Sequence, residues 1–416
     1  MMRANFLYQQ AWVHRIRGEL SRAWTLILEG IEVKGLKGSP FPEAHLSYAA
    51  ADLLHALGKT MEARQYLNRV EKIAHDMESL YVRYVAQLLK AFFAFDHEKE
   101  VEARAILQQA LAIGHQQDFT YICWWMPDMM ARLCAQALEA EIEVDYVRKL
   151  ISKTKLMPVG QAATNEAWPW AVKIYTLGRF EIYLDGKPLP SRRKAPYRVL
   201  ALLKAMIALG GRDIPTSRLI DALWPDAEGD TGEETFHKTL QRLRHLLRHD
   251  SLIQMKEGTV SLNRQLCWID AMAFQTLLNG TDDSKPRQVM SDAKVRRYEQ
   301  AIALYRGPFL DEDGTYELTD RCRERLRHQF VQTVQHVSEW KKAAGQEEAA
   351  VACLESGLGT DPLAEPLYPH LIRFLSNLER QDEAKHVLAR YHKAVIIAGR
   401  EPSVEMQRLA KNLSSS

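Results

Sequence analysis

The sequence predicts a mainly α protein in which a small α+β segment separates two segments of helical repeats. Three observations carry this prediction. Alanines recur 40 positions apart near the N-terminus, apolar residues alternate at period two near residues 174 and 182, and helical periodicity returns after residue 291. With 416 residues the chain has room for two or three domains. Its 46% apolar and 26% charged residues are typical of folded globular proteins and argue against disorder.

The first 157 residues carry an internal repeat. Ala23, Ala63 and Ala103 are each 40 positions apart, and apolar residues follow Ala63 at helical spacing. A small residue at this position lets the two helices of a hairpin approach closely. Because one hairpin cannot bury its apolar face alone, hairpins repeating every ~34 to 47 residues stack into an α-solenoid. Residues 1–157 are therefore expected to form three or four helical hairpins.

The pattern changes type after this segment. Residues 158–170 contain prolines and a glycine that break the helical period, and they are interpreted as a linker. Residues 172–176 and 180–184 then alternate apolar and polar side chains, and Asp185-Gly186 supplies a tight turn. Two short antiparallel strands are expected here.

Three helices are expected next, over residues 195–209, 216–224 and 232–248. A hairpin whose turn is Lys256-Glu257-Gly258 closes the segment. A strand pair, three helices and a terminal hairpin form a winged-helix arrangement, in which one helix enters the major groove of DNA. The sequence thus predicts an α+β winged-helix domain over residues 171–270.

The last segment, residues 271–416, begins with a polar linker or loop from Asn279 to Ser291 and is then helical. Ala384 lies 34 residues beyond Ala350, and this is the tetratricopeptide period. Asp361-Pro362 marks a turn between hairpins. This segment is expected to be a tetratricopeptide-like helical domain.

The third helix of the middle segment is the candidate reader of DNA. Its apolar residues fall on one stripe: Phe236, Leu240, Leu243 and Leu247. Four polar residues project from the opposite side: Lys238, Gln241, Arg242 and His245. Arg and Lys can donate to guanine and Gln can pair with adenine, so this face has the chemistry of base readout. A solvated helix face is the alternative, but a capping box from Thr231 to Glu234 and the wing-like hairpin favour a reader.

Other groups of the middle segment are candidates for phosphate contact. Arg192, Arg193 and Lys194 form its densest basic run, and they follow a phosphate backbone, face a protein partner or belong to a solvated loop. Thr216 presents a helix N-terminus to a phosphate or serves as an ordinary N-cap. The segment contains 16 Lys plus Arg and 12 Asp plus Glu, a modest basic excess that suits phosphate contact.

The middle and last segments together resemble a known bacterial family. Residues 174–182 and the helix from Leu240 to Leu247 resemble the OmpR-type winged helix of antibiotic-regulatory-protein activators. Four motifs of the tail resemble the bacterial transcriptional activator domain that follows this winged helix: Leu304–Leu310, Arg323–Leu326, Asp361–Leu363 and Arg400–Glu405. The two modules stand in the same order and the resemblance covers about 245 residues.

This resemblance implies a transcription activator that binds promoter repeats and contacts RNA polymerase, with the helical tail aiding assembly. Carried over by position, DNA contact falls on Thr235, Lys238, Thr239, Gln241, Arg242 and His245 in the helix and on Lys256 and Thr259 in the wing. Phe236-His237-Lys238 departs from the commoner members. The target sequence therefore does not follow from the resemblance.

Residues 1–157 resemble, more weakly, the helical-repeat sensor region of large ATP-dependent regulators related to the maltose activator. Gly58-Lys59-Thr60 ends like a Walker A motif, but position 53 is Leu where the first Gly should stand, and no strand precedes it. We interpret this match as coincidental. The chain is then either the C-terminal part of a longer regulator or a shortened relative that senses without ATP.

Other chemistry has little support in the sequence. The five cysteines are widely spaced, which argues against a zinc ribbon or disulfide framework and fits a reducing compartment. His245 and His249 lie four apart without a third ligand nearby, so no metal and no cofactor are expected. Trp124-Trp125 is interpreted as core. No catalytic arrangement stands out, and the protein is not expected to be an enzyme.

Two hypotheses stay open. The main one is a sequence-specific transcriptional regulator in the bacterial cytoplasm, associated with the nucleoid, because no apolar stretch reaches the ~20 residues of a membrane span and no signal peptide is seen. Its expected partners are double-stranded DNA, RNA polymerase, a small-molecule or protein effector on the N-terminal repeats, and a second copy on DNA. The alternative is a helical-repeat interaction scaffold whose winged helix no longer reads DNA. The two differ in whether the face around Arg242 is used.

Overall fold

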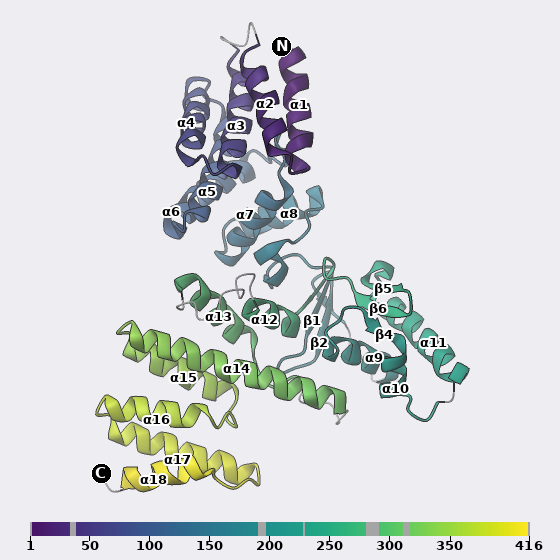
Figure 1. Cartoon of the computed structure of the whole chain (residues 1–416), viewed down its shortest axis with the longest axis vertical. Coiled ribbons are helices and arrows are strands. Elements are labelled where there is room, and N and C mark those ends of the chain that lie inside the picture. Colours follow the sequence, from purple (N-terminus) through teal and green to yellow (C-terminus); the bar gives the residue numbers. More distant parts are fainter. Residues whose placement is uncertain are drawn as a thin grey trace. The chain divides into compact units, whose positions relative to one another are not determined.

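The computed structural model describes residues 2–33, 39–189, 197–227, 229–279, 291–310 and 317–414. The chain divides into two compact units, residues 1–169 and 170–416 (Figure 1). Most described residues are helical, which confirms the predicted mainly α class. Among these residues, no helix combines the length and the apolar character needed to cross a bilayer.

The first unit consists of antiparallel helices in four successive pairs (Figure 1). The helices are α1 (Met2–Ile16), α2 (Leu20–Ile31), α3 (Pro40–Ala56), α4 (Thr60–Asp76), α5 (Leu80–Asp96), α6 (Glu100–Gln116), α7 (Pro127–Glu139) and α8 (Val144–Thr154). The predicted hairpins are thus confirmed. Ala23, Ala63 and Ala103 are fully buried, each in the first turn or two of the second helix of a hairpin. Gly58, at φ +77°, belongs to the turn between α3 and α4 and not to a phosphate-binding loop.

A buried polar network ties the first hairpins to the segment that precedes α7. The carboxylate of Asp52, 2% exposed, accepts from Nε of Arg15 at 2.7 Å and from Nε1 of Trp124 at 3.0 Å. Trp124 is fully buried, as its interpretation as core predicts, but Trp125, for which core was also expected, is only half-buried and lines a cavity. Such a network fixes geometry because each buried polar atom in it has a partner.

The expected linker at residues 158–170 ends where the first unit meets the second, at residues 169 and 170, but it is folded and not extended. It forms a short 3₁₀ helix, Gly160–Thr164, and Ala162 and Trp168 are buried. The side-chain amide of Asn165 donates to the carbonyl of Ala135 on α7 at 2.9 Å. The prolines end the helical period here, but the tryptophan and the alanine supply enough apolar surface to hold the segment against the repeats.

The second unit begins with two small sheets. The four-stranded sheet has the order β3-β2-β1-β7 and the three-stranded sheet the order β4-β6-β5. The strands are β1 (Val172–Tyr175), β2 (Glu181–Leu184), β3 (Lys187–Pro188), β4 (Ile214–Pro215), β5 (Ile253–Lys256), β6 (Thr259–Leu262) and β7 (Cys267–Ile269). The antiparallel pair β1–β2 confirms the first predicted hairpin. Asp185-Gly186, however, turns β2 into β3, a strand that the sequence pattern does not indicate.

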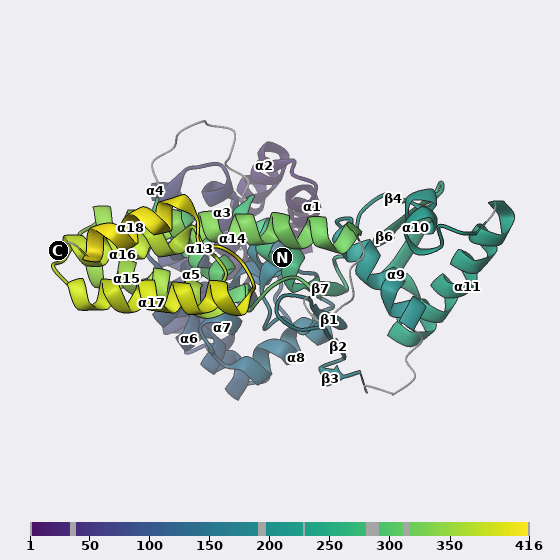
Figure 2. The same ribbon diagram turned by 90° about the horizontal axis from the view of Figure 1, so that it is seen from below.

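Helices fill the rest of the second unit, whose C-terminal part is helical as expected (Figure 2). They are α9 (Tyr197–Ala208), α10 (Thr216–Leu223), α11 (Gly229–Leu247), α12 (Asp270–Leu278), α13 (Asp292–Leu304), α14 (Glu317–Ala343), α15 (Glu347–Thr360), α16 (Leu367–Asn377), α17 (Gln381–Ile397) and α18 (Val404–Ser414), with a 3₁₀ turn at Asp250–Leu252. Ala350 and Ala384 are fully buried. Most of the expected linker between Asn279 and Ser291 lies outside the described residues.

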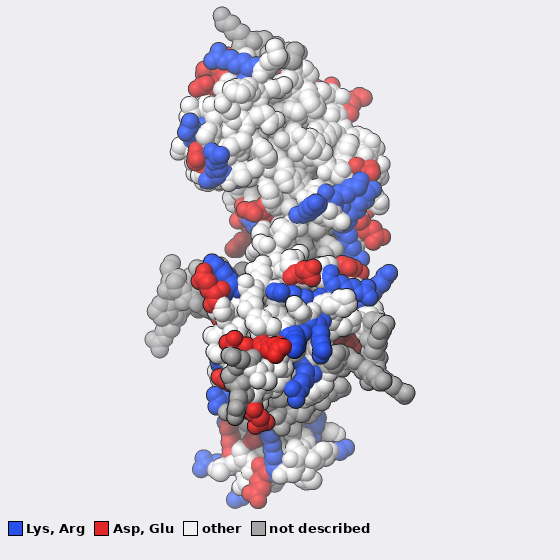
Figure 3. All heavy atoms as spheres, turned by 90° about the vertical axis from the view of Figure 1, so that its right-hand side faces the viewer, with Lys and Arg blue, Asp and Glu red and all other residues white. Residues whose placement is uncertain are grey.

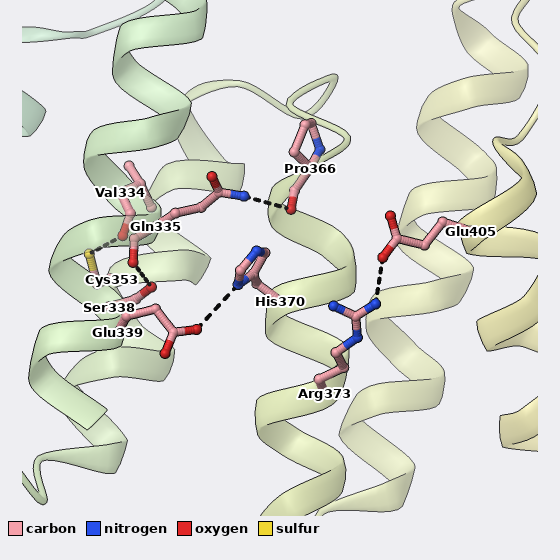
Figure 4. Close-up of polar contacts among 9 residues, drawn as sticks. All are labelled: Val334, Gln335, Ser338, Glu339, Cys353, Pro366, His370, Arg373 and Glu405. Carbon is pink, nitrogen blue, oxygen red and sulfur yellow. Dashed lines mark hydrogen bonds and ion pairs between the residues drawn. The ribbon is translucent and has the colours of Figure 1, made fainter. Parts of the chain in front are cut away.

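One hydrophobic core runs through the whole second unit, from Val172 in β1 to Leu413 in α18. The long helix α14 packs against α9 at one end and α15 along its length. Polar contacts join α14, α16 and α18: His370 lies 3.5 Å from Glu339, and Arg373 pairs with Glu405 (Figure 4). The winged-helix segment and the helical tail therefore share their apolar interior.

A buried carboxylate marks the start of α12. Asp270, 1% exposed, accepts from the backbone N–H groups of Thr176, Leu177 and Ala271 and from the Thr176 hydroxyl, at 2.6 to 2.9 Å. Burial raises the pKa of Asp270 to about 6, while these hydrogen bonds act in the opposite direction. Asp270 thereby fixes the end of β1 to the first turn of α12.

Candidate nucleic-acid interface

The helix α11 is anchored by the apolar stripe that its sequence predicts. The four residues of the stripe are at most 2% exposed: Phe236, Leu240, Leu243 and Leu247. They pack into the core beside α9, so the rotation of α11 about its axis is fixed by burial. The predicted capping box is wrong, because α11 begins at Gly229 and Thr231 lies inside its first turn. The carbonyl of Thr231 instead accepts from the hydroxyl of Thr235 at 2.8 Å.

Burial of the stripe leaves a polar face of α11 in solvent. It includes the four residues expected from the sequence, Lys238, Gln241, Arg242 and His245, and the exposed residues before them on the helix are Thr231, Glu233, Glu234 and His237. The four expected residues lie on successive turns of one helix and form a single row, which we call the α11 face. Lys238 pairs with the exposed Glu234 one turn earlier, and this hydrogen bond lowers the pKa of the Glu234 carboxyl.

The two threonines of α11 differ in position. Thr235 is half-buried beside the α11 face. Thr239 is 6% exposed, and its hydroxyl donates to the carbonyl of Thr235 at 2.7 Å. The expectation that Thr239 contacts DNA is therefore corrected: its side chain belongs to the packed side of the helix, and its hydroxyl already has a backbone partner.

The hairpin β5–β6 follows α11 as a wing. Its turn is Glu257-Gly258, with φ of +49° and +73°, the two left-handed conformations that a tight two-residue hairpin needs. The side chains of Lys256 and Glu257 are each 84% exposed and lie 3.7 Å apart. The half-buried Thr259 donates its hydroxyl to the carbonyl of Lys256 at 2.7 Å. The wing thus offers one cation at its tip, beside one anion.

Backbone contacts hold the wing to the preceding elements. β6 pairs with β4, and the N–H of Thr216 at the start of α10 donates to the carbonyl of Gly258 at 2.9 Å. Thr216 is half-buried, and Pro215 occupies the N-cap position without a side-chain cap. The sequence alternative that opens α10 with Thr216 as N-cap is therefore not what the structure shows.

Arg244 is a residue of this site that sequence reasoning missed. Its Nη2 donates to the carbonyl of Ile253 in β5 at 2.9 Å, so it links α11 to the wing. The only signal in the sequence is a cation one position after Leu243, on the flank of the buried stripe. Its partner is a backbone carbonyl, which no sequence pattern marks.

The basic run Arg192, Arg193 and Lys194 lies outside the described residues. Figure 3 shows the side of the molecule on which α11 lies, where acidic side chains are interspersed among the basic ones. This matches the modest basic excess of residues 171–270. His249 lies 3.8 Å from Asp185, and the described residues contain no group of three His, Cys, Asp or Glu side chains that could hold a metal ion.

Comparison with known proteins places the tail and relates the chain to a regulator. Residues 269–414 match the bacterial transcriptional activator domain. The transcriptional regulatory protein EmbR of Mycobacterium tuberculosis and of Mycobacterium bovis is 23% identical over 222 residues, which is 50% of this chain and 54% of EmbR. The chain thus spans about half the length of the curated relatives that it matches.

Two solved structures are similar over longer stretches. Mycobacterium tuberculosis EmbR in complex with a low-affinity phosphopeptide matches with 21% identity, 59% of this chain, 65% of that chain and a TM-score of 0.40. The tetratricopeptide domain of P58(IPK) matches with 12% identity, 99% of this chain, 97% of that chain and a TM-score of 0.21. In sequence, the chain carries a bacterial transcriptional activator domain and is related to a transcriptional regulator.

Proposed function

We propose that this protein is a sequence-specific, double-stranded-DNA-binding transcriptional activator. The observation that carries the proposal is the α11 face: a helix whose buried stripe directs Lys238, Gln241, Arg242 and His245 outward, beside a wing that ends in Lys256. In a winged helix, a helix of this kind lies in the major groove while the wing reaches the backbone. The activator domain at residues 269–414 supports the regulatory role.

In this proposal, each side chain of the α11 face contacts a different group of the DNA. Arg242 can donate two parallel hydrogen bonds to O6 and N7 of a guanine, and Gln241 can pair with N6 and N7 of an adenine. Lys238 reaches DNA after it releases Glu234, so a guanine or phosphate competes with that carboxylate. Lys256 and the backbone around Thr259 serve the phosphates, which position the protein without specifying sequence.

Partners beyond DNA follow from the domain order. The activator domain contacts RNA polymerase, two copies bind neighbouring promoter repeats, and the helical repeats of the first unit receive a small-molecule or protein effector. In this proposal the protein acts at the bacterial nucleoid and catalyses no reaction. What supports it is the activator-domain match and the sequence relation to a transcriptional regulator.

The experiment that tests the proposal is selection from a randomised double-stranded DNA library by the full chain, at two salt concentrations. We expect enrichment of a repeated motif. Arg242→Ala should weaken binding to that motif by ~1–3 kcal/mol and relax specificity at one base pair. Arg64→Ala is the matched control, because Arg64 is an exposed arginine on α4 of the first unit.

A different result supports the scaffold. Weak, unselective binding that disappears at physiological salt, with Arg242→Ala and Arg64→Ala indistinguishable, would show phosphate attraction alone. The repeats would then be the functional surfaces and the winged helix a structural spacer.

A further inference from the structure

The first unit contains a polar cluster that the proposed function does not use, centred on Cys123. The thiol lies in the connector between α6 and α7, residues 117–126. The connectors after α1, α3, α4 and α5 have only three residues each. The longer connector reaches back to the first hairpin, since the carbonyl of Trp125 accepts from Nε1 of Trp12 on α1 at 2.9 Å.

Three helices direct a polar side chain toward Cys123. These side chains are Tyr8 of α1, His45 of α3 and Tyr81 of α5. The three helices are the first helices of the first, second and third hairpins. Tyr8 is 5% exposed, and its hydroxyl and Nε2 of His45 are buried without a hydrogen-bond partner among the described residues. The hydroxyl of Tyr81 accepts from the backbone N–H of Cys123 at 3.0 Å, which leaves its own proton for the sulfur.

This environment distinguishes Cys123 from the other four cysteines. Burial raises the pKa of its thiol, but the polar groups of His45, Tyr8 and Tyr81 beside the thiol outweigh burial and lower the pKa. Burial raises the pKa of Cys134 and Cys267 to about 12 and that of Cys353 to about 11, and it also raises that of Cys322. Cys353 is half-buried like Cys123, so exposure alone does not account for the difference.

Cys123 also lines a cavity of about 370 Å³, large enough for a small molecule. Aromatic rings from Trp12, Tyr121 and Trp125 form much of its wall, and Gln9 and Thr154 supply polar atoms. None of the described residues that line it carries a charge. The cavity therefore fits a flat, uncharged molecule with an oxygen that can accept or donate a hydrogen bond.

We propose that this cavity is a reactive-thiol site, in which Cys123 adds to a planar, uncharged α,β-unsaturated carbonyl compound. The sulfur forms a bond to the β carbon, the electron pair of the C=C bond moves toward the carbonyl, and the thiol proton ends on the α carbon. An S–C and a C–H bond replace an S–H bond and one C–C π bond. The addition needs neither oxidant nor reductant. The site belongs to the first unit, and this proposal does not depend on whether the second unit binds DNA.

The test is competition among the cysteines of the full chain for a limiting amount of N-phenylmaleimide, read by peptide mapping. Cys123 should react at least roughly tenfold faster than Cys353 at pH 7, because its thiol pKa is lowered while that of Cys353 is raised, so a larger fraction of Cys123 is the reactive thiolate. The lower intrinsic nucleophilicity of a low-pKa thiolate offsets only part of this gain. Cys123→Ser should abolish the fast phase. Equal rates at Cys123 and Cys353 would overturn the proposal.

Three further variants distinguish the effect of the thiol environment from the effect of the cavity. His45→Gln should slow Cys123 and move the midpoint of its pH–rate profile with iodoacetamide upward, while Cys353 is unchanged. Tyr81→Phe repeats this test if His45→Gln fails to fold. Thr154→Trp, which narrows the cavity, should slow N-phenylmaleimide but not the smaller iodoacetamide. An unchanged midpoint in the folded variant, or equal slowing of both reagents by Thr154→Trp, would contradict the site.

Discussion

Nη2 of Arg244 donates to the carbonyl of Ile253 at 2.9 Å, and through this bond the helix proposed to read DNA fixes the first strand of its wing. The two residues are nine positions apart, on either side of the 3₁₀ turn Asp250–Leu252. Because Arg244 is half-buried, its loss leaves a backbone carbonyl without its donor.

Arg244→Ala should lower the free energy of unfolding of the second unit by about 1–2 kcal/mol, the usual effect of removing a charged donor from a backbone acceptor. Urea unfolding followed by circular dichroism measures this. Arg242→Ala, on the exposed α11 face of the same helix, is the matched control and should leave stability unchanged. Equal stability of both variants would mean that the wing does not depend on Arg244.

The pair at the wing tip predicts opposite effects of neighbouring substitutions. Lys256→Ala should weaken binding to all DNA sequences alike and reduce the slope of log affinity against log salt by about one, because one phosphate contact is lost. Glu257→Gln should strengthen binding, since it removes the anion 3.7 Å from Lys256. Fluorescence anisotropy over a salt series distinguishes them, and identical salt slopes for all three proteins would exclude the wing from the interface.

Asp270 predicts a pH-dependent term in stability. Because its pKa is raised from 3.8 to about 6, the native state holds this proton more tightly than the unfolded chain. The contribution is therefore complete below pH ~4 and is lost as pH rises through 6. The unfolding free energy of wild type minus that of Asp270→Asn should be larger at pH 4 than at pH 7, by on the order of 2 kcal/mol. A difference that is constant with pH would contradict this.

Much of the α11 site could be predicted from sequence, because its determinants are periodic and local. A stripe with a 3.6-residue period defines the exposed face, and Glu257-Gly258 carries its own turn signal. The same period also predicts that Thr239 is buried, because Thr239 lies three residues after Phe236 and four before Leu243, on the packed side of the helix.

What the sequence did not indicate depends on contacts between distant segments. β3, β4 and β7 have only two or three residues each, too few to show alternation, and they exist because β2, β6 and β1 pair with them. Likewise, the cluster around Cys123 joins residues from three hairpins that are each unremarkable in sequence.

Gly178 and Gly307 lie where the winged-helix segment meets the tail, and a Cβ on Gly307 would lie 2.7 Å from the Cα of Gly178. Gly178 has φ +80°, and a Cβ there would lie 2.6 Å from the carbonyl oxygen of Arg306. Gly178→Ala should therefore destabilise the second unit by about 2–4 kcal/mol through combined backbone strain and collision. Gly186→Ala, at φ +77° with open space around it, is the control and should cost only about 1 kcal/mol. Thermal unfolding of the two variants makes the comparison, and equal shifts would show that the close approach is dispensable.

The close contact between Gly178 and Arg306 has a consequence for how stabilisation in one part of the second unit affects the other part. The backbone N–H of Gly178 donates to the carbonyl of Pro308, and the backbone N–H of Leu310 donates to the carbonyl of Thr176. These hydrogen bonds connect the backbone after β1 to the segment that precedes α14. Because the two parts also share one apolar interior, we expect them to unfold in one cooperative transition rather than two. If α11 binds DNA as proposed, binding should also raise the melting temperature of α15 to α18, and proteolytic cleavage within the tail should weaken the packing of the wing.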